Sequence, residues 1–204
     1  MARARREWIA GSIYHVFARG SNRQSIFLNE GDYVEFDMLF TEAIRKHRLE
    51  TFGWSLMPNH WHGLFRCPAD GLSRFMQRLN HRYALRFDRR WSRTAHVFDN
   101  RFGAVLQKTD EQFLWTLRYV VRNPVEAGLC ASPFDARWTS FRATAGVVRA
   151  PAFLRVDAIL EHFGEEPSRA RERFVDFIVD EARGDRVPDA LAPQASSPHP
   201  AFAV

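Results

Sequence analysis

The order in which helical and strand-like hydrophobic patterns follow one another restricts the fold more than any other feature of this sequence. Apolar residues recur at three- and four-residue spacing over 31–48 and 72–90, which predicts two amphipathic helices. Short segments rich in strand-forming residues lie at 13–18, 51–56, 61–66 and 102–106. Asp110 is then expected to cap a third helix that runs to about Arg122.

The predicted order is strand, helix, strand, strand, helix, strand, helix. Met57-Pro58-Asn59 separates two of the strand-like segments, and this turn signal favours a hairpin. An antiparallel sheet with helices on one face fits this order, so we expect an α+β protein with a ferredoxin-like, RRM-like sheet. We assign residues 1–146 to this domain.

The rest of the chain differs in character. Residues 147–183 are predicted to form a helical extension, with helices over 157–163 and 168–183. Residues 184–204 consist largely of Pro, Ala and Ser with few large apolar groups, and we expect this tail to be disordered.

Composition narrows the class of protein. Hydrophobic residues make up 46% of the 204, enough for a packed core, and the net charge of +5 with a pI near 9.7 favours a polyanionic partner. The two cysteines, Cys67 and Cys130, have no metal-ligand spacing, which argues against a zinc ribbon. Because no apolar run approaches the ~18 residues of a membrane span and no secretory signal is visible, we expect a cytoplasmic protein.

The motif Asn59-His60-Trp61-His62 is the first candidate for chemistry. Side chains two apart on a strand point to the same face, so His60 and His62 can converge on one divalent cation. The alternative is that one histidine is a turn residue and the other a surface residue of the strand.

Tyr119 and Asn123 form the second candidate. Residues four apart share one helical face, so the phenol and the amide can reach a common point. A tyrosine oxygen can attack a phosphodiester that a metal polarises, and Asn123 could complete the metal site. The alternative is a core tyrosine followed by an Asn-Pro helix boundary at Pro124.

Arginines on the second helix form the third candidate. They recur every fourth residue, at Arg74, Arg78, Arg82, Arg86 and Arg90. A row of one sign needs an anion to relieve its repulsion, and a phosphate backbone would serve, although a solvated face is the alternative. Arg19, Arg23 and Arg101 could extend this basic surface.

Several motifs in a fixed order carry a family resemblance. They are Tyr14-His15-Val16, Arg19-Gly20-Ser21-Asn22-Arg23-Gln24, Met57-Pro58-Asn59-His60-Trp61-His62, Met76-Gln77-Arg78-Leu79-Asn80 and Arg118-Tyr119-Val120-Val121-Arg122-Asn123-Pro124-Val125-Glu126-Ala127-Gly128-Leu129. Over roughly residues 8–146 the chain closely resembles the REP-associated tyrosine transposases, relatives of the HUH single-strand transposases of bacterial insertion sequences.

The resemblance implies a metal-dependent enzyme that cuts and rejoins single-stranded DNA at hairpin-forming palindromes. His60 and His62 would hold Mg²⁺ or Mn²⁺, and Tyr119 would become joined to a DNA 5′-phosphate. Asn123 matches a further ligand position, which is usually Gln in the insertion-sequence branch. Residues 19–23, including Asn22, and the second helix are where we expect DNA contacts. The resemblance is compatible with a monomer and with a homodimer, so both states stay open.

Two other functions compete with this hypothesis. A ferredoxin-like sheet with aromatic residues also serves non-catalytic single-stranded nucleic-acid binders, which would tolerate Tyr119→Phe. A metal hydrolase that uses bound water would leave no protein–DNA adduct, but no carboxylate pair near the histidines supplies its base.

Overall fold

The structure, a computed structural model, describes residues 8–68, 71–99 and 101–181. Its strands are β1 (Ile13–Arg19), β2 (Glu50–Met57), β3 (His60–Arg66) and β4 (Gly103–Leu106). Its α-helices are α1 (Glu30–His47), α2 (Gly71–Trp91), α3 (Asp110–Glu126), α4 (Phe141–Thr144), α5 (Val156–Leu160) and α6 (Pro167–Val179). Short 3₁₀ turns cover Ser21–Arg23 and Glu161–Phe163.

The four strands form one antiparallel sheet in the order β2-β3-β1-β4. This order and the preceding β-α-β-β-α-β succession are those of a ferredoxin-like sheet, so the predicted fold class is confirmed. The β2–β3 hairpin turns at Pro58 and Asn59, as the sequence predicts.

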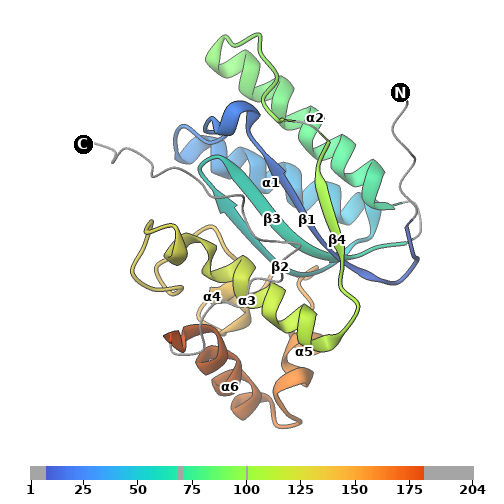
Figure 1. Ribbon diagram of the computed structural model, residues 1–204, viewed down its shortest axis with the longest axis vertical. Coiled ribbons are helices and arrows are strands. Elements are labelled where there is room, and N and C mark those ends of the chain that lie inside the picture. Colours follow the sequence, from blue (N-terminus) through green and yellow to red (C-terminus); the bar gives the residue numbers. More distant parts are fainter. Residues whose placement is uncertain (1–7, 69–70, 100, 182–204) are drawn as a thin grey trace.

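The two faces of the sheet carry different helices (Figure 1). On one face Trp61 of β3 packs against Phe36 and Phe40 of α1, with ring centroids 5.6 and 5.9 Å apart. On the other face Phe52 of β2 packs edge-on against Phe113 of α3. The expectation of helices on one face therefore holds for α1 and α2, whereas α3 covers the opposite face.

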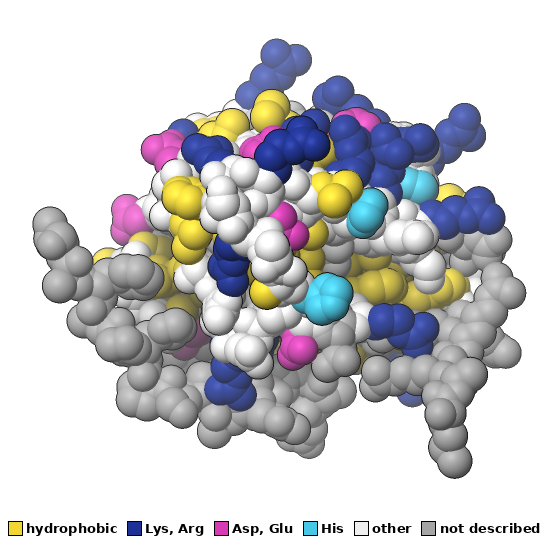
Figure 2. Space-filling view, turned by 90° about the horizontal axis from the view of Figure 1, so that it is seen from above, with side chains coloured by type: hydrophobic (Ala, Val, Ile, Leu, Met, Phe, Trp, Pro, Cys, Tyr) yellow, Lys and Arg dark blue, Asp and Glu magenta, His cyan; other side chains and the backbone are white. Residues whose placement is uncertain are grey.

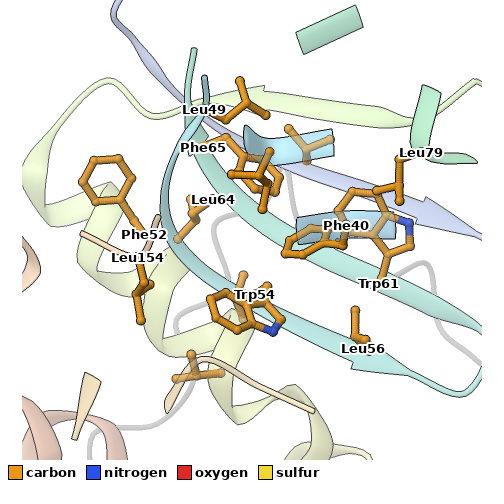
Figure 3. Packing of buried hydrophobic residues seen from close by; sticks show 14 of the residues in the cluster. Phe40, Leu49, Phe52, Trp54, Leu56, Trp61, Leu64, Phe65, Leu79 and Leu154 are labelled. Atoms are coloured by element: carbon orange, nitrogen blue, oxygen red, sulfur yellow. The ribbon is translucent and has the colours of Figure 1, made fainter. Parts of the chain in front are cut away.

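Buried aromatic and aliphatic side chains fill both sides of the sheet (Figure 3). Phe40, Trp61 and Leu79 meet between the sheet and the α1–α2 pair, while Phe52 and Leu154 lie on the side of α3. Leu154 belongs to the segment after residue 146, so this segment contributes to the same core. Burial of such side chains is the main stabilising term for both layers.

Helix α3 departs from its expected bounds. Thr109, rather than Asp110, is the N-cap, and its hydroxyl accepts a hydrogen bond from the backbone N–H of Gln112. The expected end at Arg122 is also wrong, because the helix continues through Pro124 to Glu126. Proline removes one N–H from the helical ladder, and Pro124 lies buried at this end of the helix.

The C-terminal segment forms helices close to those expected. The range 157–163 contains most of α5 and a 3₁₀ turn, and 168–183 contains most of α6, which ends at Val179. The tail 184–204, which was expected to be disordered, lies outside the described residues. None of the helices described is long and apolar enough to cross a membrane.

Candidate metal and nucleophile site

Strand β3 places its two histidines on the sheet face that α3 covers. His60 and His62 alternate with Trp61, which points into the α1 side, and the two imidazole centroids lie 4.9 Å apart. His62 is 4% exposed, so burial removes the alternative of a surface histidine on the strand. The prediction that the two histidines share one face is thus met by the geometry.

Helix α3 brings the predicted nucleophile to the same point. The ring of Tyr119 stands edge-on to His62, with centroids 5.5 Å apart and an interplanar angle of 78°. One turn later, Oδ1 of Asn123 lies 3.3 Å from Nε2 of His60. Residues from β3 and α3 that are about 60 positions apart in sequence therefore meet at a single site.

The donor atoms at this site suit a divalent cation. Nε2 of His62 is buried and has no hydrogen-bond partner among the described residues, and Nε2 of His60 faces the amide oxygen of Asn123. Burial is the main cause that lowers the pKa of His60, to about 4, and the pKa of His62 well below its usual value. Both imidazoles are neutral at physiological pH, which is the form that binds metals.

A third donor for such a cation, taken from the residues that the structure describes, would not be a His, Cys, Asp or Glu side chain. Within the described ranges, no group of three or more His, Cys, Asp and Glu side chains could hold a metal ion. The amide oxygen of Asn123 is the additional donor that the geometry offers, and oxygen donors suit Mg²⁺ and Mn²⁺. The three residues predicted as ligands are therefore brought together.

Two residues beside the site were missed as functional candidates. His15 of β1 lies on the same face, and its Nε2 is 2.9 Å from Nδ1 of His62. Oδ1 of Asn59 accepts a hydrogen bond at 2.6 Å from Nδ1 of His60. The alternation His15-Phe17-Arg19 was a signal for one face of a strand, but only the register between β1 and β3 shows that this face meets His62.

The predicted DNA-contact loop, residues 19–23, lies directly against the turn that contains Asn59 and His60. Arg19 is the cross-strand partner of His60, and its positive charge contributes to the lowered pKa of both His60 and His62. Nδ2 of Asn59 donates to the carbonyl of Arg23, which ties the loop to the hairpin. Asn22 and Arg23 both have left-handed backbone angles (φ 52° and 60°) and are exposed.

The arginine row on α2 faces acidic side chains of α1. Four of its arginines form ion pairs with carboxylates of α1: Glu42 pairs with Arg78 and Arg82, Glu35 pairs with Arg86, and Asp32 lies 3.6 Å from Arg90. Hydrogen bonds from Arg82 and then Arg78 lower the pKa of Glu42 to about 2. The anions that the row was expected to need from outside are supplied by α1 for Arg78, Arg82, Arg86 and Arg90, and DNA contacts from the row stay a prediction.

Three further arginines were also predicted to contact DNA. Arg19, Arg23 and Arg101 take part in no ion pair within the part of the chain that the structure describes. In the view of Figure 2, many Lys and Arg side chains gather over the upper and right-hand part of the surface, with some Asp and Glu side chains among them. Such a surface attracts a phosphate backbone.

The helix that carries Tyr119 is fastened to α6. The guanidinium of Arg118, 1% exposed, donates to the carbonyls of Phe177, Ile178 and Asp180 at the end of α6. Arg122 donates to the carbonyl of Ile178 as well, and it also pairs with Glu126. These arginines satisfy carbonyls that a helix end leaves without donors, so the C-terminal helices hold α3 in place.

Comparisons with known proteins agree with this architecture. The family described as "Transposase IS200 like" matches residues 9–126. A solved REP-associated tyrosine transposase bound to a REP hairpin is 20% identical, with a TM-score of 0.61, and the match covers 74% of this chain and 89% of that one. A search of the curated proteins finds no match.

Two other solved structures are less similar. A putative transposase from Deinococcus radiodurans is 14% identical with a TM-score of 0.42, and the match covers 58% of this chain and 95% of that one. A tRNA(His) guanylyltransferase from Saccharomyces cerevisiae is 10% identical with a TM-score of 0.42, over 85% and 81% of the two chains. The family match spans more than half of the chain and contains both histidines and Tyr119; the chain belongs to the IS200-like transposase family.

Proposed function

We propose that this transposase is a metal-dependent single-stranded DNA endonuclease and strand transferase that works through a 5′-phosphotyrosine intermediate. The observation that carries the proposal is the meeting of Tyr119 with His60, His62 and Asn123 on one face of the sheet. A core tyrosine would not require two neutral imidazoles and an amide oxygen beside it.

His60, His62 and Asn123 would hold the metal, Mg²⁺ or Mn²⁺. The buried Nε2 of His62, which lacks a partner among the described residues, is the atom that fits this role best. When bound, the cation supplies Lewis-acid polarisation of the scissile phosphate. Arg19, whose charge acts on both histidines, would add positive charge on the same side.

The covalent step balances without any further reactant. The Tyr119 oxygen forms a bond to phosphorus, and the bond between phosphorus and the DNA 3′-oxygen breaks. The phenol loses its proton, and the departing 3′-oxygen gains one to become a hydroxyl. Attack by a 3′-hydroxyl on the phosphotyrosine reverses these changes and joins strands, because the ester conserves the bond energy.

Hairpin-forming palindromes are the substrate that we propose. Support comes from the family resemblance and from the REP-associated transposase of similar fold, whose structure holds a REP hairpin. In this chain the exposed loop at Asn22 and Arg23 adjoins the histidine turn through Asn59, so DNA held there would lie near Tyr119. We propose contacts from Arg19, Asn22, Arg23 and Arg101.

The test is formation of a covalent protein–DNA adduct. The protein is incubated with Mn²⁺ and a single-stranded hairpin oligonucleotide from the host's repeated palindromes, and the products are run on a denaturing protein gel. A label at the 3′ end of the DNA should migrate with the protein, whereas a label at the 5′ end should leave in a fragment ending in a 3′-hydroxyl. EDTA should abolish both products.

Variants separate the competing functions. Tyr119→Phe and His60→Ala/His62→Ala should give no adduct, while the control Tyr33→Phe, a ring stacked on Trp138 away from the site, should behave as wild type. Binding of several hairpins without any adduct from wild type would favour a non-catalytic binder. Cleavage that survives Tyr119→Phe would favour a hydrolase that uses water.

A further inference from the structure

His15 and His62 form a hydrogen-bonded pair of buried imidazoles. Nε2 of His15 and Nδ1 of His62 are 2.9 Å apart, and the two rings lie nearly parallel at 16°. His15 is 1% exposed and His62 is 4% exposed. This distance is that of a hydrogen bond, so one of the two nitrogens carries the shared proton and the other accepts it.

Counting the protons on this pair leaves two arrangements. Two neutral imidazoles carry two N–H protons, and one of them lies in the hydrogen bond between the rings. The second proton is on Nδ1 of His15 or on Nε2 of His62, and both of these atoms are buried without a partner among the described residues. Since one buried N–H lacks an acceptor in either arrangement, the pair by itself has little preference between them.

Metal ligation distinguishes the two arrangements. A ligating imidazole nitrogen must present its lone pair, so Nε2 of His62 cannot keep a proton when it binds a cation. The second proton must then lie on Nδ1 of His15, and His62 must donate from Nδ1 to Nε2 of His15. In this arrangement His15 is not itself a ligand, because its Nε2 accepts this hydrogen bond and its Nδ1 carries the second proton.

We propose that His15 is a positioning residue that fixes His62 as the Nδ1–H tautomer and so aims the lone pair of Nε2 at the metal. This inference rests on the proposed metal site. Residues that hold the outer nitrogen of a ligating histidine fix its ring orientation and raise its basicity. The sequence motifs gave His15 no role of its own, because it appears there only as part of Tyr14-His15-Val16.

The second ligand has a matching arrangement. Both nitrogens of His60 face amide oxygens, which can only accept, but Nδ1 is closer to Asn59, at 2.6 Å, than Nε2 is to Asn123, at 3.3 Å. The shorter contact favours a proton on Nδ1, which leaves the lone pair of Nε2 on the side of Asn123. Both ligands are therefore oriented by a neighbour of their own, His60 from its own turn and His62 from the adjacent strand β1.

The first measurement is Mn²⁺ affinity by calorimetry on the full chain. His15→Leu, which removes the acceptor, should weaken affinity by about 10–100-fold. His15→Gln, whose amide oxygen can accept from Nδ1 of His62, should restore affinity to within a few-fold of wild type. His81→Leu, a change at an exposed histidine of α2, is the matched control and should have no effect.

The second measurement needs no variant. Nitrogen-15 NMR of the imidazoles should show, on addition of diamagnetic Mg²⁺, a proton on Nδ1 of both His62 and His15 and none on Nε2 of either. This spectrum tests the tautomer of His62 even if the His15→Leu variant does not fold. Circular dichroism would show whether that variant folds.

Several results would overturn the proposal. They are wild-type affinity in a folded His15→Leu variant, equal weakening by the Leu and Gln variants, or a proton on Nε2 of His62 in saturating Mg²⁺. Absence of any Mn²⁺ or Mg²⁺ binding by wild type would instead refute the proposed metal site itself, and the role of His15 with it. The two failures are thus separate observations.

Discussion

Oδ1 of Asn123 lies 3.3 Å from Nε2 of His60, so the last turn of α3 meets the first residue of β3. Asn123 is 8% exposed, and its backbone belongs to a helix that is anchored from the other side by Arg118 and Arg122. Packing of α3 therefore holds the amide of Asn123 near the histidines. A substitution at Asn123 can then test whether its oxygen contributes to metal binding.

Substitutions at Asn123 should separate loss of an oxygen ligand from loss of packing. We expect Asn123→Ala to weaken Mn²⁺ binding by at least about tenfold, and Asn123→Asp, which keeps an oxygen, to retain or strengthen it. Calorimetry provides the measurement, with Gln77→Ala on the exposed face of α2 as control. Equal affinity in the Ala variant and wild type would show that Asn123 is not a ligand.

A mixing experiment tests whether one chain supplies the whole site. The ring centroids of Tyr119 and His62 in the same chain lie 5.5 Å apart, which supports assembly of the site within a monomer. Equimolar Tyr119→Phe and His60→Ala/His62→Ala proteins should then form no adduct on the denaturing gel. Recovery of adduct in the mixture would mean that two chains exchange α3, and sedimentation of the wild type would show the accompanying dimer.

Salt dependence of hairpin binding should distinguish the two groups of arginines. Arg23→Gln should weaken binding and reduce the slope of log affinity against log salt by about 1, because it removes one phosphate contact. Arg86→Gln should change the slope much less, since Glu35 already engages Arg86 at 2.8 Å. Fluorescence anisotropy at several salt concentrations measures both, and the reverse order would restore the α2 row as the DNA surface.

The buried histidines should make the metal-free protein sensitive to acid. Burial lowers the pKa of His15 to about 3, and burial with the charge of Arg19 lowers that of His60 to about 4, whereas an unfolded histidine titrates near 6.5. Between these values the unfolded chain binds protons that the folded chain does not. The free energy of unfolding should therefore fall as pH drops from about 7 to 4, by on the order of 3 kcal/mol for each of these two histidines.

Urea titrations in EDTA at each pH measure this loss. His15→Gln removes one of the titrating groups, so its pH dependence should be shallower, whereas His81→Leu should follow wild type. Carboxylates contribute equally to all three proteins, and the difference between the curves isolates the buried imidazole. Parallel curves for wild type and His15→Gln would contradict the lowered pKa of His15.

Arg118 should matter for stability because it is buried against the end of α6. Its replacement by Met keeps much of the apolar stem but leaves the carbonyls at the end of α6 without their donor, so we expect a loss of about 2–4 kcal/mol in the free energy of unfolding. Arg169→Met, an exposed position on α6, is the control. A loss below about 1 kcal/mol would show that α6 is held by its apolar face alone.

The sequence by itself determined those features that depend on neighbours along the chain. Periodicity placed the strands and helices up to β4 close to their observed bounds, and alternation along one strand put His60 and His62 on a common face. Helical spacing likewise put Tyr119 and Asn123 together. These properties follow from backbone geometry, which repeats every few residues whatever the rest of the molecule does.

Tertiary structure decided what depends on contacts between distant segments. Only the packing of α1 against α2 supplied Glu35 and Glu42 to the arginine row, and only the register of β1 with β3 set His15 against His62. In each case the deciding partner is many positions away in sequence, where local periodicity carries no information about it.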